Sequence, residues 1–182
     1  MNRRFALIGL SIAAVPLFAV PGIRLAGAQT AGTAPPTVGP LDYAQYRART
    51  LMAGTAARQS SEIALQRATN PRVKQFAGFE AAEQLTMAQI LTNTHNPPPV
   101  LLDSTHAAMV QTIEGAPSGA GFDRAYVQGQ IQGHQELLAI HNGFLNNQTA
   151  MTAEGVHAAM LGRTAIMMHL TMLQDLETQL RA

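Results

Sequence analysis

Residues 70–99 read NPRVKQFAGFEAAEQLTMAQILTNTHNPPP, and this stretch contains the start, the buried face and the end of one long helix. Asn70 suits a helix N-cap, and Pro71 suits the first helical position, where the missing N–H of proline costs nothing. The three consecutive prolines at 97–99 cannot continue a helix. We therefore predict a helix over residues 71–94, followed by a loop to about residue 103.

One face of this predicted helix carries residues at the alternating four- and three-residue spacing of a helix packed in a bundle. The members of this face are Val73, Ala77, Glu80, Gln84, Met87 and Leu91. Four of them are apolar, whereas Glu80 and Gln84 place polar groups on the side expected to be buried. The stretch therefore predicts a bundle helix with two polar residues on its core face.

The remaining chain predicts three more long helices and one short one. The long helices are expected over residues 42–69, 122–148 and 152–180, and the short one runs from Asp103 or Ser104 to Glu114. The β-branched alternation typical of strands is missing from the sequence. The predicted fold class is all-α, an up-down four-helix bundle with an extra short helix between helices two and three.

The third and fourth long helices carry histidines on their core faces. These faces are Val127, Ile131, His134, Leu138, His141 and Leu145 on the third helix, and Ala158, Gly162, Ala165, His169, Met172 and Leu176 on the fourth. On both helices the spacing again alternates between four and three residues. Imidazole groups are therefore expected inside the bundle.

The N-terminus is typical of a secretory signal peptide. Arg3 and Arg4 are followed by an apolar run from Phe5 to Val20, and residues 26–28 supply a small-x-small cleavage pattern. We predict a signal peptide over residues 1–28, a flexible Pro-rich leader over 29–40 and a helical bundle domain over 41–182. We expect the protein to be exported across the inner membrane to the periplasm or cell envelope and to have no membrane span after signal cleavage.

Composition excludes several classes of function. Without residues 1–28 the twelve Lys and Arg fall to nine against eleven Asp and Glu, a formal charge of −2, so no basic surface suggests nucleic acid as a partner. The chain has no cysteine, which excludes disulfides, thiolate nucleophiles and thiolate metal ligands. Its nine methionines are expected to fill gaps in the core.

Several phrases of the sequence resemble one known family. They are Glu62 with Ala64-Leu65 and Ala68, Asn70-Pro71-x-Val73-Lys74-x-Phe76-Ala77, Gly121-Phe122-Asp123-x-x-Tyr126, His134 and His169-Leu170. Together they resemble the bacterial secreted family called domain of unknown function 4142, over residues 42–180. The resemblance implies a ferritin-like four-helix bundle in the cell envelope, and that family has no established activity to carry over.

The chain departs from the family pattern on its second long helix. Members usually show a Met and then an Asp-His pair soon after the Phe-Ala of that helix, whereas this chain has Glu80, Glu83 and Gln84 there. The expected histidine is Gln84. Gln84 cannot supply the imidazole ligand that the family pattern implies, so a metal site shared by the family would be altered in this chain.

The strongest candidate site combines Glu62, Glu80, His134 and His169, one residue from each long helix. We expect these side chains to converge, and two imidazoles with two carboxylates would accept a single divalent metal ion. A buried polar network, in which the same groups hydrogen-bond to one another and bind nothing, is the main alternative. A role in proton transfer or small-ligand binding is the third.

Two other metal sites can be considered. Met160, Met167, Met168, His169 and Met172 offer the thioether and imidazole ligands that select Cu(I). A ferritin-like di-iron oxidase needs two Glu-x-x-His pairs. The sequence has one such pair, Glu154 and His157, in the first turn of a predicted helix.

The sequence thus predicts an exported envelope protein of uncharacterised, non-enzymatic function, with a polar interhelical centre that is a candidate metal site. The alternatives are a Met/His copper-binding periplasmic protein and a ferritin-like metal-dependent oxidase. A further class, an interaction protein, would work through an exposed apolar patch, with a second copy or another envelope protein as partner.

Overall fold

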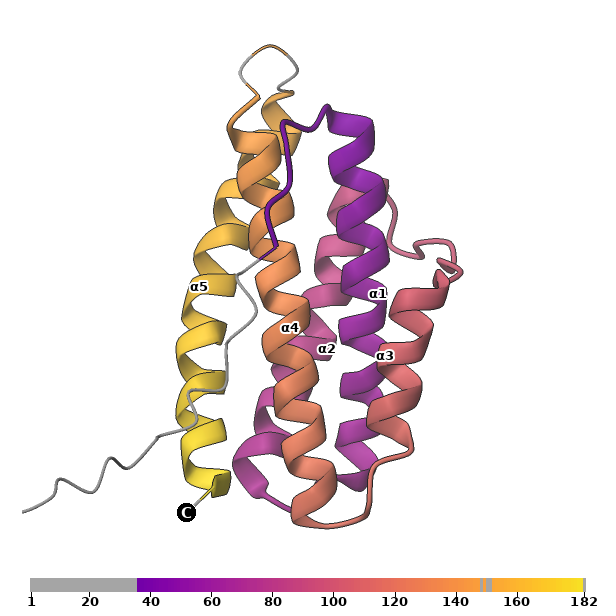
Figure 1. Ribbon diagram of the computed structural model, residues 1–182. Coiled ribbons are helices and arrows are strands. Elements are labelled where there is room, and N and C mark those ends of the chain that lie inside the picture. Colours follow the sequence, from indigo (N-terminus) through magenta and orange to yellow (C-terminus); the bar gives the residue numbers. More distant parts are fainter. Residues whose placement is uncertain (1–35, 148, 150–151, 182) are drawn as a thin grey trace, which may run out of the picture. The chain divides into compact units, whose positions relative to one another are not determined.

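The computed structural model describes residues 36–147, 149 and 152–181, and the regular structure of these residues is entirely helical (Figure 1). The helices are α1 (Tyr43–Arg67), α2 (Pro71–Thr92), α3 (Ser104–Glu114), α4 (Ala120–Leu145) and α5 (Ala153–Arg181). The predicted all-α bundle with a short helix between the second and third long helices is confirmed. The predicted signal peptide and residues 29–35 of the predicted leader lie outside the described residues.

The four long helices form a ring in which α1 packs against α2 and α4, and α5 packs against α4 and α2. The backbone N–H of Asn70, at the start of α2, donates to Asp123, at the start of α4. The backbone N–H of Leu41, before α1, donates to Gly143, near the end of α4. Helices α2 and α4 therefore run parallel, because the connection that contains α3 returns the chain to the end where α2 began (Figure 1). The predicted up-down order is wrong in this respect, since the second and third long helices point the same way.

The helix boundaries follow from local side-chain chemistry. Asp42 and Gln45 form a capping box at the start of α1, with hydrogen bonds of 2.8 and 3.1 Å. The Asn70 side chain accepts from the backbone N–H groups of Arg72 and Val73. Asn93 ends α2 in the left-handed conformation, with φ 52°. These signals are local, which is why the sequence could place the helix ends within a few residues.

The core consists of two apolar clusters with a polar layer between them. One cluster includes Phe76, Phe122 and Leu173, and the other includes Tyr46 and Phe144. The buried polar side chains of α2, α4 and α5 between these clusters are Glu80, Gln84, Gln130, His134 and His169. Apolar packing thus lies on either side of this polar layer.

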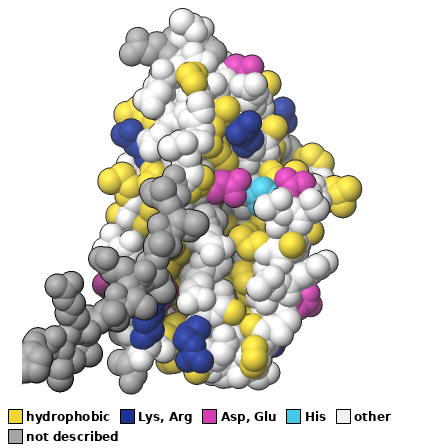
Figure 2. Space-filling model, in the orientation of Figure 1, with side chains coloured by type: hydrophobic (Ala, Val, Ile, Leu, Met, Phe, Trp, Pro, Cys, Tyr) yellow, Lys and Arg dark blue, Asp and Glu magenta, His cyan; other side chains and the backbone are white. Residues whose placement is uncertain are grey.

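Methionine was expected in the core, and on α5 this expectation is wrong. Met160, Met167, Met168 and Met172 of this helix are all exposed, and Leu173 takes the core position predicted for Met172. Figure 2 shows hydrophobic side chains scattered among polar and charged ones on one face of the molecule. Among the described residues, no helix is both long and apolar enough to cross a membrane.

Gly162 provides a test of the core packing. A Cβ at this position would lie 2.7 Å from His141 Cε1 and 3.0 Å from Met87 Cε. Gly162→Ala should therefore lower the free energy of unfolding by about 1–3 kcal/mol through overpacking, measured by urea denaturation. Gly133→Ala on α4 is the matched control, because a Cβ there meets nothing within 4 Å. A variant at Gly162 as stable as the control would place this face of α5 away from the core.

Candidate metal centre

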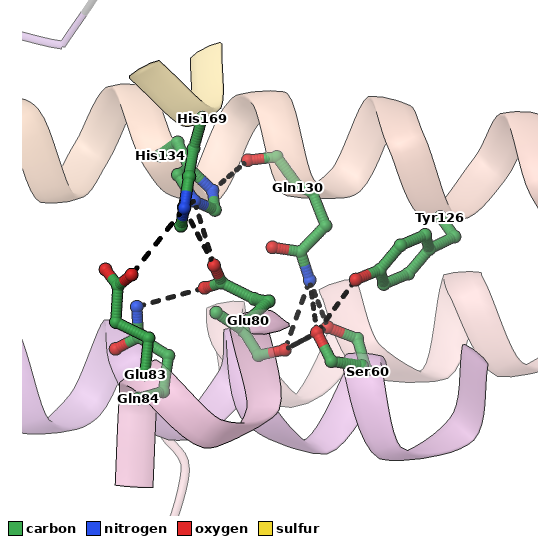
Figure 3. A network of polar contacts seen from close by, with 10 residues as sticks. Ser60, Glu80, Glu83, Gln84, Tyr126, Gln130, His134 and His169 are labelled. Carbon is green, nitrogen blue, oxygen red and sulfur yellow. Dashed lines mark hydrogen bonds and ion pairs between the residues drawn. The ribbon is translucent and has the colours of Figure 1, made fainter. Parts of the chain in front are cut away.

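Three side chains from three helices meet at mid-bundle: Glu80 of α2, His134 of α4 and His169 of α5 (Figure 3). Glu80 Oε2 lies 3.2 Å from His134 Nε2 and 3.2 Å from His169 Nδ1. The two ring nitrogens are also 3.2 Å apart. Glu80 and His134 are fully buried, and His169 is 8% exposed. Three potential ligand atoms therefore form a nearly equilateral triangle inside the protein.

The dimensions of this triangle fit a metal ion. Ligand atoms about 2.0–2.1 Å from a tetrahedral Zn²⁺ are about 3.3–3.4 Å from one another. Glu80 Oε2 accepts no hydrogen bond from the described residues, although two ring nitrogens lie 3.2 Å away. A buried carboxylate oxygen without a donor is costly. A cation at the centre of the triangle would satisfy it.

Each of the three residues is also held by a partner on its outer side. His134 Nδ1 lies 2.8 Å from the backbone carbonyl of Gln130. Since a carbonyl only accepts, Nδ1 carries the proton and Nε2 presents a lone pair to the centre. The Gln84 amide donates to the other carboxylate oxygen of Glu80 at 3.0 Å. Such outer partners are typical of metal sites, where they orient the ligands.

His169 is positioned by a second carboxylate. Its Nε2 lies 3.6 Å from Glu83 Oε2, on the side of the ring away from Glu80 (Figure 3). Burial lowers the pKa of His169, but the close contact with Glu80 and the charges of Glu80 and Glu83 outweigh burial, so its pKa is raised. Burial is also the main reason why the pKa of Glu83 is raised. The ring of His169 thus bridges a buried carboxylate and a half-buried one.

The charge state of Glu80 also suits a metal ligand. Burial alone raises the pKa of the Glu80 carboxyl, but the close contacts with His134 and His169 outweigh burial and bring its pKa to about 2. The carboxylate form is the one that binds a metal ion. Glu80 is therefore ready to bind a cation at neutral pH.

The polar layer continues from the centre to α1. The Gln130 side-chain amide donates to the hydroxyl groups of Ser60 and Ser61 at 3.0 and 3.3 Å, and Ser61 contacts the Tyr126 hydroxyl at 2.8 Å (Figure 3). Gln130 Oε1 is buried and has no hydrogen-bond partner among the described residues. Helix α1 therefore contributes hydroxyl groups to this layer and no carboxylate.

Comparison with protein families supports the resemblance seen in the sequence. A family model described as Domain of unknown function (DUF4142) matches residues 27–176, most of the chain. The chain belongs to this family. A search of curated proteins gives no match, and a search of solved structures gives none either. Membership of DUF4142 does not identify a function, because the family is described as a domain of unknown function.

Three of the four residues predicted for the candidate site meet in the structure, and Glu62 does not. Its side chain is half-exposed and pairs with Arg58, one turn earlier on α1, at 2.8 Å. Ser61, the next residue back, points inward and is fully buried. The expected convergence of Glu62 is wrong because its position is one step around the helix from the buried face.

Gln84 stands where DUF4142 members were expected to have a histidine. Its amide binds the outer oxygen of Glu80 and does not face the ring nitrogens. A Cβ at Gly54 of α1 would lie 2.4 Å from Gln84 Oε1, so the glycine makes room for this side chain. Gln84 therefore holds a ligand in place in this chain.

Sequence reasoning gave no role to Glu83 and did not select Gln130. Gln130 lies one helical turn before His134, and Glu83 lies one turn after Glu80. Residues three or four positions from a candidate ligand lie next to it on the helix surface, and this spacing could have indicated both partners. The spacing identifies a partner only once the ligand itself is known to face the interior.

The other metal sites considered do not assemble. Met160, Met167, Met168 and Met172 are exposed, whereas His169 points into the bundle. Glu154 and His157 are exposed in the first turns of α5. The methionines therefore lie on the outer side of α5, and the Glu-x-x-His pair lies on the surface.

His141, the second histidine on the α4 core face, lies outside the centre and should make the protein sensitive to acid. Its Nδ1 is 3.2 Å from the Tyr46 hydroxyl, and burial, with a smaller effect of Arg163, lowers its pKa to about 4. The unfolded chain takes up this proton near pH 6.5 and the folded protein does not, so stability falls between about pH 6.5 and 4. The expected loss is about 2–3 kcal/mol, measured by urea denaturation against pH.

The difference between wild type and His141→Gln isolates this contribution from that of His169, whose raised pKa acts in the opposite direction. His95→Gln, at an exposed position, is the control. Parallel pH profiles of wild type and His141→Gln would contradict the assignment.

Proposed function

We propose that this protein is an exported, non-enzymatic protein of the bacterial cell envelope whose helical bundle holds one divalent transition-metal ion. The observation that carries the proposal is the buried triangle of Glu80 Oε2, His134 Nε2 and His169 Nδ1 with sides of 3.2 Å. The lack of a hydrogen-bond donor for Glu80 Oε2 supports a metal over a closed polar network.

The ligand set favours a borderline metal such as Zn²⁺. Two imidazoles and one carboxylate suit Zn²⁺ in a mononuclear site, with water in the fourth position. Bound there, the ion would link α2, α4 and α5 and stabilise the fold by its binding free energy. Burial of all three ligands supports a binding role over turnover of a large substrate.

Titration of the chelator-treated protein with Zn²⁺ tests the proposal. We expect one tightly bound equivalent in isothermal titration calorimetry. Glu80→Gln keeps the shape of the side chain but removes its charge, and should weaken this binding by a factor of ten to a hundred or more. Equal affinity in wild type and Glu80→Gln would show that the triangle is a polar network.

An Fe²⁺-dependent oxidase is the second candidate function. Two histidines and one carboxylate with open positions form the facial triad of non-haem iron oxygenases. The single crossover between α2 and α4 also supports a ferritin-like bundle. Oxygen consumption by the Fe²⁺-loaded protein, absent in Glu80→Gln, would favour this function, and no consumption above the variant would remove it.

Export is tested by the N-terminus of the mature protein. If residues 1–28 are a signal peptide, intact mass of the protein from the envelope fraction should correspond to a chain that begins at Gln29. Replacing Ala26 and Ala28 by bulky residues should block cleavage and leave the precursor in the membrane fraction. A mature chain that retains Met1 would contradict the proposed localisation.

A further inference from the structure

A second group of ligand-type side chains lies between α3 and α4, outside the centre described above. His106 of α3 is 8% exposed, and its Nδ1 is 2.8 Å from Asp103 Oδ1. Its Nε2 is 3.3 Å from Glu136 Oε2 of α4. His106 and Glu136 line a cavity of about 360 Å³ together with Gln132 and Thr105. One imidazole thus stands between two carboxylates at the edge of a cavity.

The contact between His106 and Glu136 does not have the geometry of a hydrogen bond. His106 Nε2 is buried and has no hydrogen-bond partner among the described residues, although the carboxylate oxygen is only 3.3 Å away. In a hydrogen-bonded pair the acceptor lies close to the N–H direction. In a metal site the arrangement is different. The ion lies along the lone-pair direction of the imidazole nitrogen, and the other ligand atom lies to the side of that direction.

Asp103 prepares His106 for this role. Its Oδ1 accepts from the backbone N–H of His106 at 2.9 Å, as the N-cap of α3, and contacts the ring at Nδ1. The carboxylate is therefore fixed by the helix start, and the proton of a neutral ring is held on Nδ1. Nε2 is then left with its lone pair, and Glu136 lies beside it. A carboxylate, a histidine and a cation in this order form a common arrangement in zinc proteins.

The separation of the two ligand atoms also fits a cation. Ligands about 2.0–2.1 Å from a tetrahedral Zn²⁺ are about 3.3–3.4 Å apart, and this pair is 3.3 Å apart. Glu136 is partly exposed, with 39% of its side-chain surface accessible, so water can complete the coordination. The chemistry is that of a half-open site with one nitrogen and one oxygen ligand.

We infer that His106 Nε2 and Glu136 Oε2 form a second binding site for a divalent cation of the Zn²⁺ class, at the α3–α4 seam. It is independent of the centre at mid-bundle, because it shares no residue with it. Two protein ligands and water bind more weakly than three buried ligands, so this site fills only when Zn²⁺ is supplied. It gives the protein a labile cation site in addition to the buried one.

Zn²⁺ binding to the full mature chain, measured by calorimetry and native mass spectrometry, tests the inference. Wild type should bind two equivalents, one of them at least tenfold more weakly. His134→Ala should retain the weak equivalent, and Glu136→Gln should retain only the tight one. Glu114→Gln, at an exposed position on α3, is the matched control and should behave as wild type.

Glu136→Gln is chosen because the Glu136 side chain is partly exposed and glutamine has the same shape. A circular dichroism spectrum equal to that of wild type confirms that the variant folds. Wild type that binds only the tight equivalent, or Glu136→Gln that retains the weak one, would overturn the second site. Wild type that binds only the weak equivalent would instead refute the proposed central site. The two failures are therefore distinguishable.

Discussion

His134→Ala is expected to remove most of the rise in melting temperature that Zn²⁺ produces in the wild-type protein, and to leave only the smaller contribution of the weak site at His106 and Glu136. At a free Zn²⁺ concentration one hundred times the Kd, binding stabilises the folded state by about 2.7 kcal/mol, which corresponds to roughly 5–11 °C for a chain of this size. The variant removes one of three ligands and leaves Glu80 and His169 with an incomplete site. Differential scanning calorimetry with and without Zn²⁺ measures the effect.

The same variant should also be less stable without metal. His134 is fully buried and holds contacts to Glu80, His169 and the Gln130 carbonyl. Truncation leaves these groups unpaired and should cost about 1–3 kcal/mol. Glu62→Gln is the control for metal binding, since Glu62 lies at the surface beside Arg58. A Zn²⁺ response of wild-type size in His134→Ala, or one that disappears in Glu62→Gln, would refute the site as described.

Asp123→Ala should lower the free energy of unfolding by about 3–5 kcal/mol. The Asp123 side chain is almost fully buried and accepts three hydrogen bonds: from the backbone N–H of Thr69 at 3.0 Å, the Thr69 hydroxyl at 2.7 Å and the backbone N–H of Asn70 at 2.9 Å. These bonds join the start of α4 to the turn between α1 and α2. Hydrogen bonds to an ionised group contribute about 1.5–3 kcal/mol each, and the N–H groups left behind would lack a protein partner.

Two matched variants separate this role from a general effect of removing a carboxylate. Thr69→Val removes only the hydroxyl bond and should cost about 1–2 kcal/mol. Asp175→Ala, at an exposed position on α5, should change stability by less than about 0.5 kcal/mol. Urea denaturation gives all three values. An Asp123→Ala variant as stable as Asp175→Ala would mean that the α1–α2 turn is not held by this carboxylate.

The fold was predictable because its determinants are local in sequence. Asn70 and Pro71 start α2, Asp42 and Gln45 start α1, and the prolines at 97–99 follow the end of α2. Each signal acts within one helical turn and requires no knowledge of the tertiary structure. Helix direction was less accessible, since it depends on where α3 carries the chain before α4 begins.

The site was predictable only in part. Glu80, His134 and His169 each fit the spacing of the core face of their own helix, so their burial could be deduced from periodicity. Glu62 could not be placed in this way, because α1 is rich in small residues and its buried face is made of Ala, Gly, Ser and Thr as well as Tyr46. A buried face made of such small residues does not show whether Ser61 or Glu62 points into the core. The orientation of α1 is set by its packing against α2 and α4.

The outer partners of the site escaped prediction for a related reason. Gln130 is uncharged, and glutamine is common on solvent-exposed helix faces. Gln84 was placed on the core face, but its contact with Glu80 was not predicted. Their roles depend on which atoms of His134 and Glu80 point away from the centre, and this follows from side-chain conformation. The exposed methionines of α5 show the same limit, because apolar composition does not show whether a helix face is buried.

The metal content of the protein purified from the cell envelope without chelator tests the central claim most directly. After extensive desalting to remove weakly held ions, elemental analysis should give about one transition-metal ion per wild-type chain. Glu80→Gln and His134→Ala, prepared in the same way, should contain none. Wild-type protein with no more metal than these two variants, even after exposure to Zn²⁺, would show that Glu80, His134 and His169 form a polar network and do not bind a metal ion.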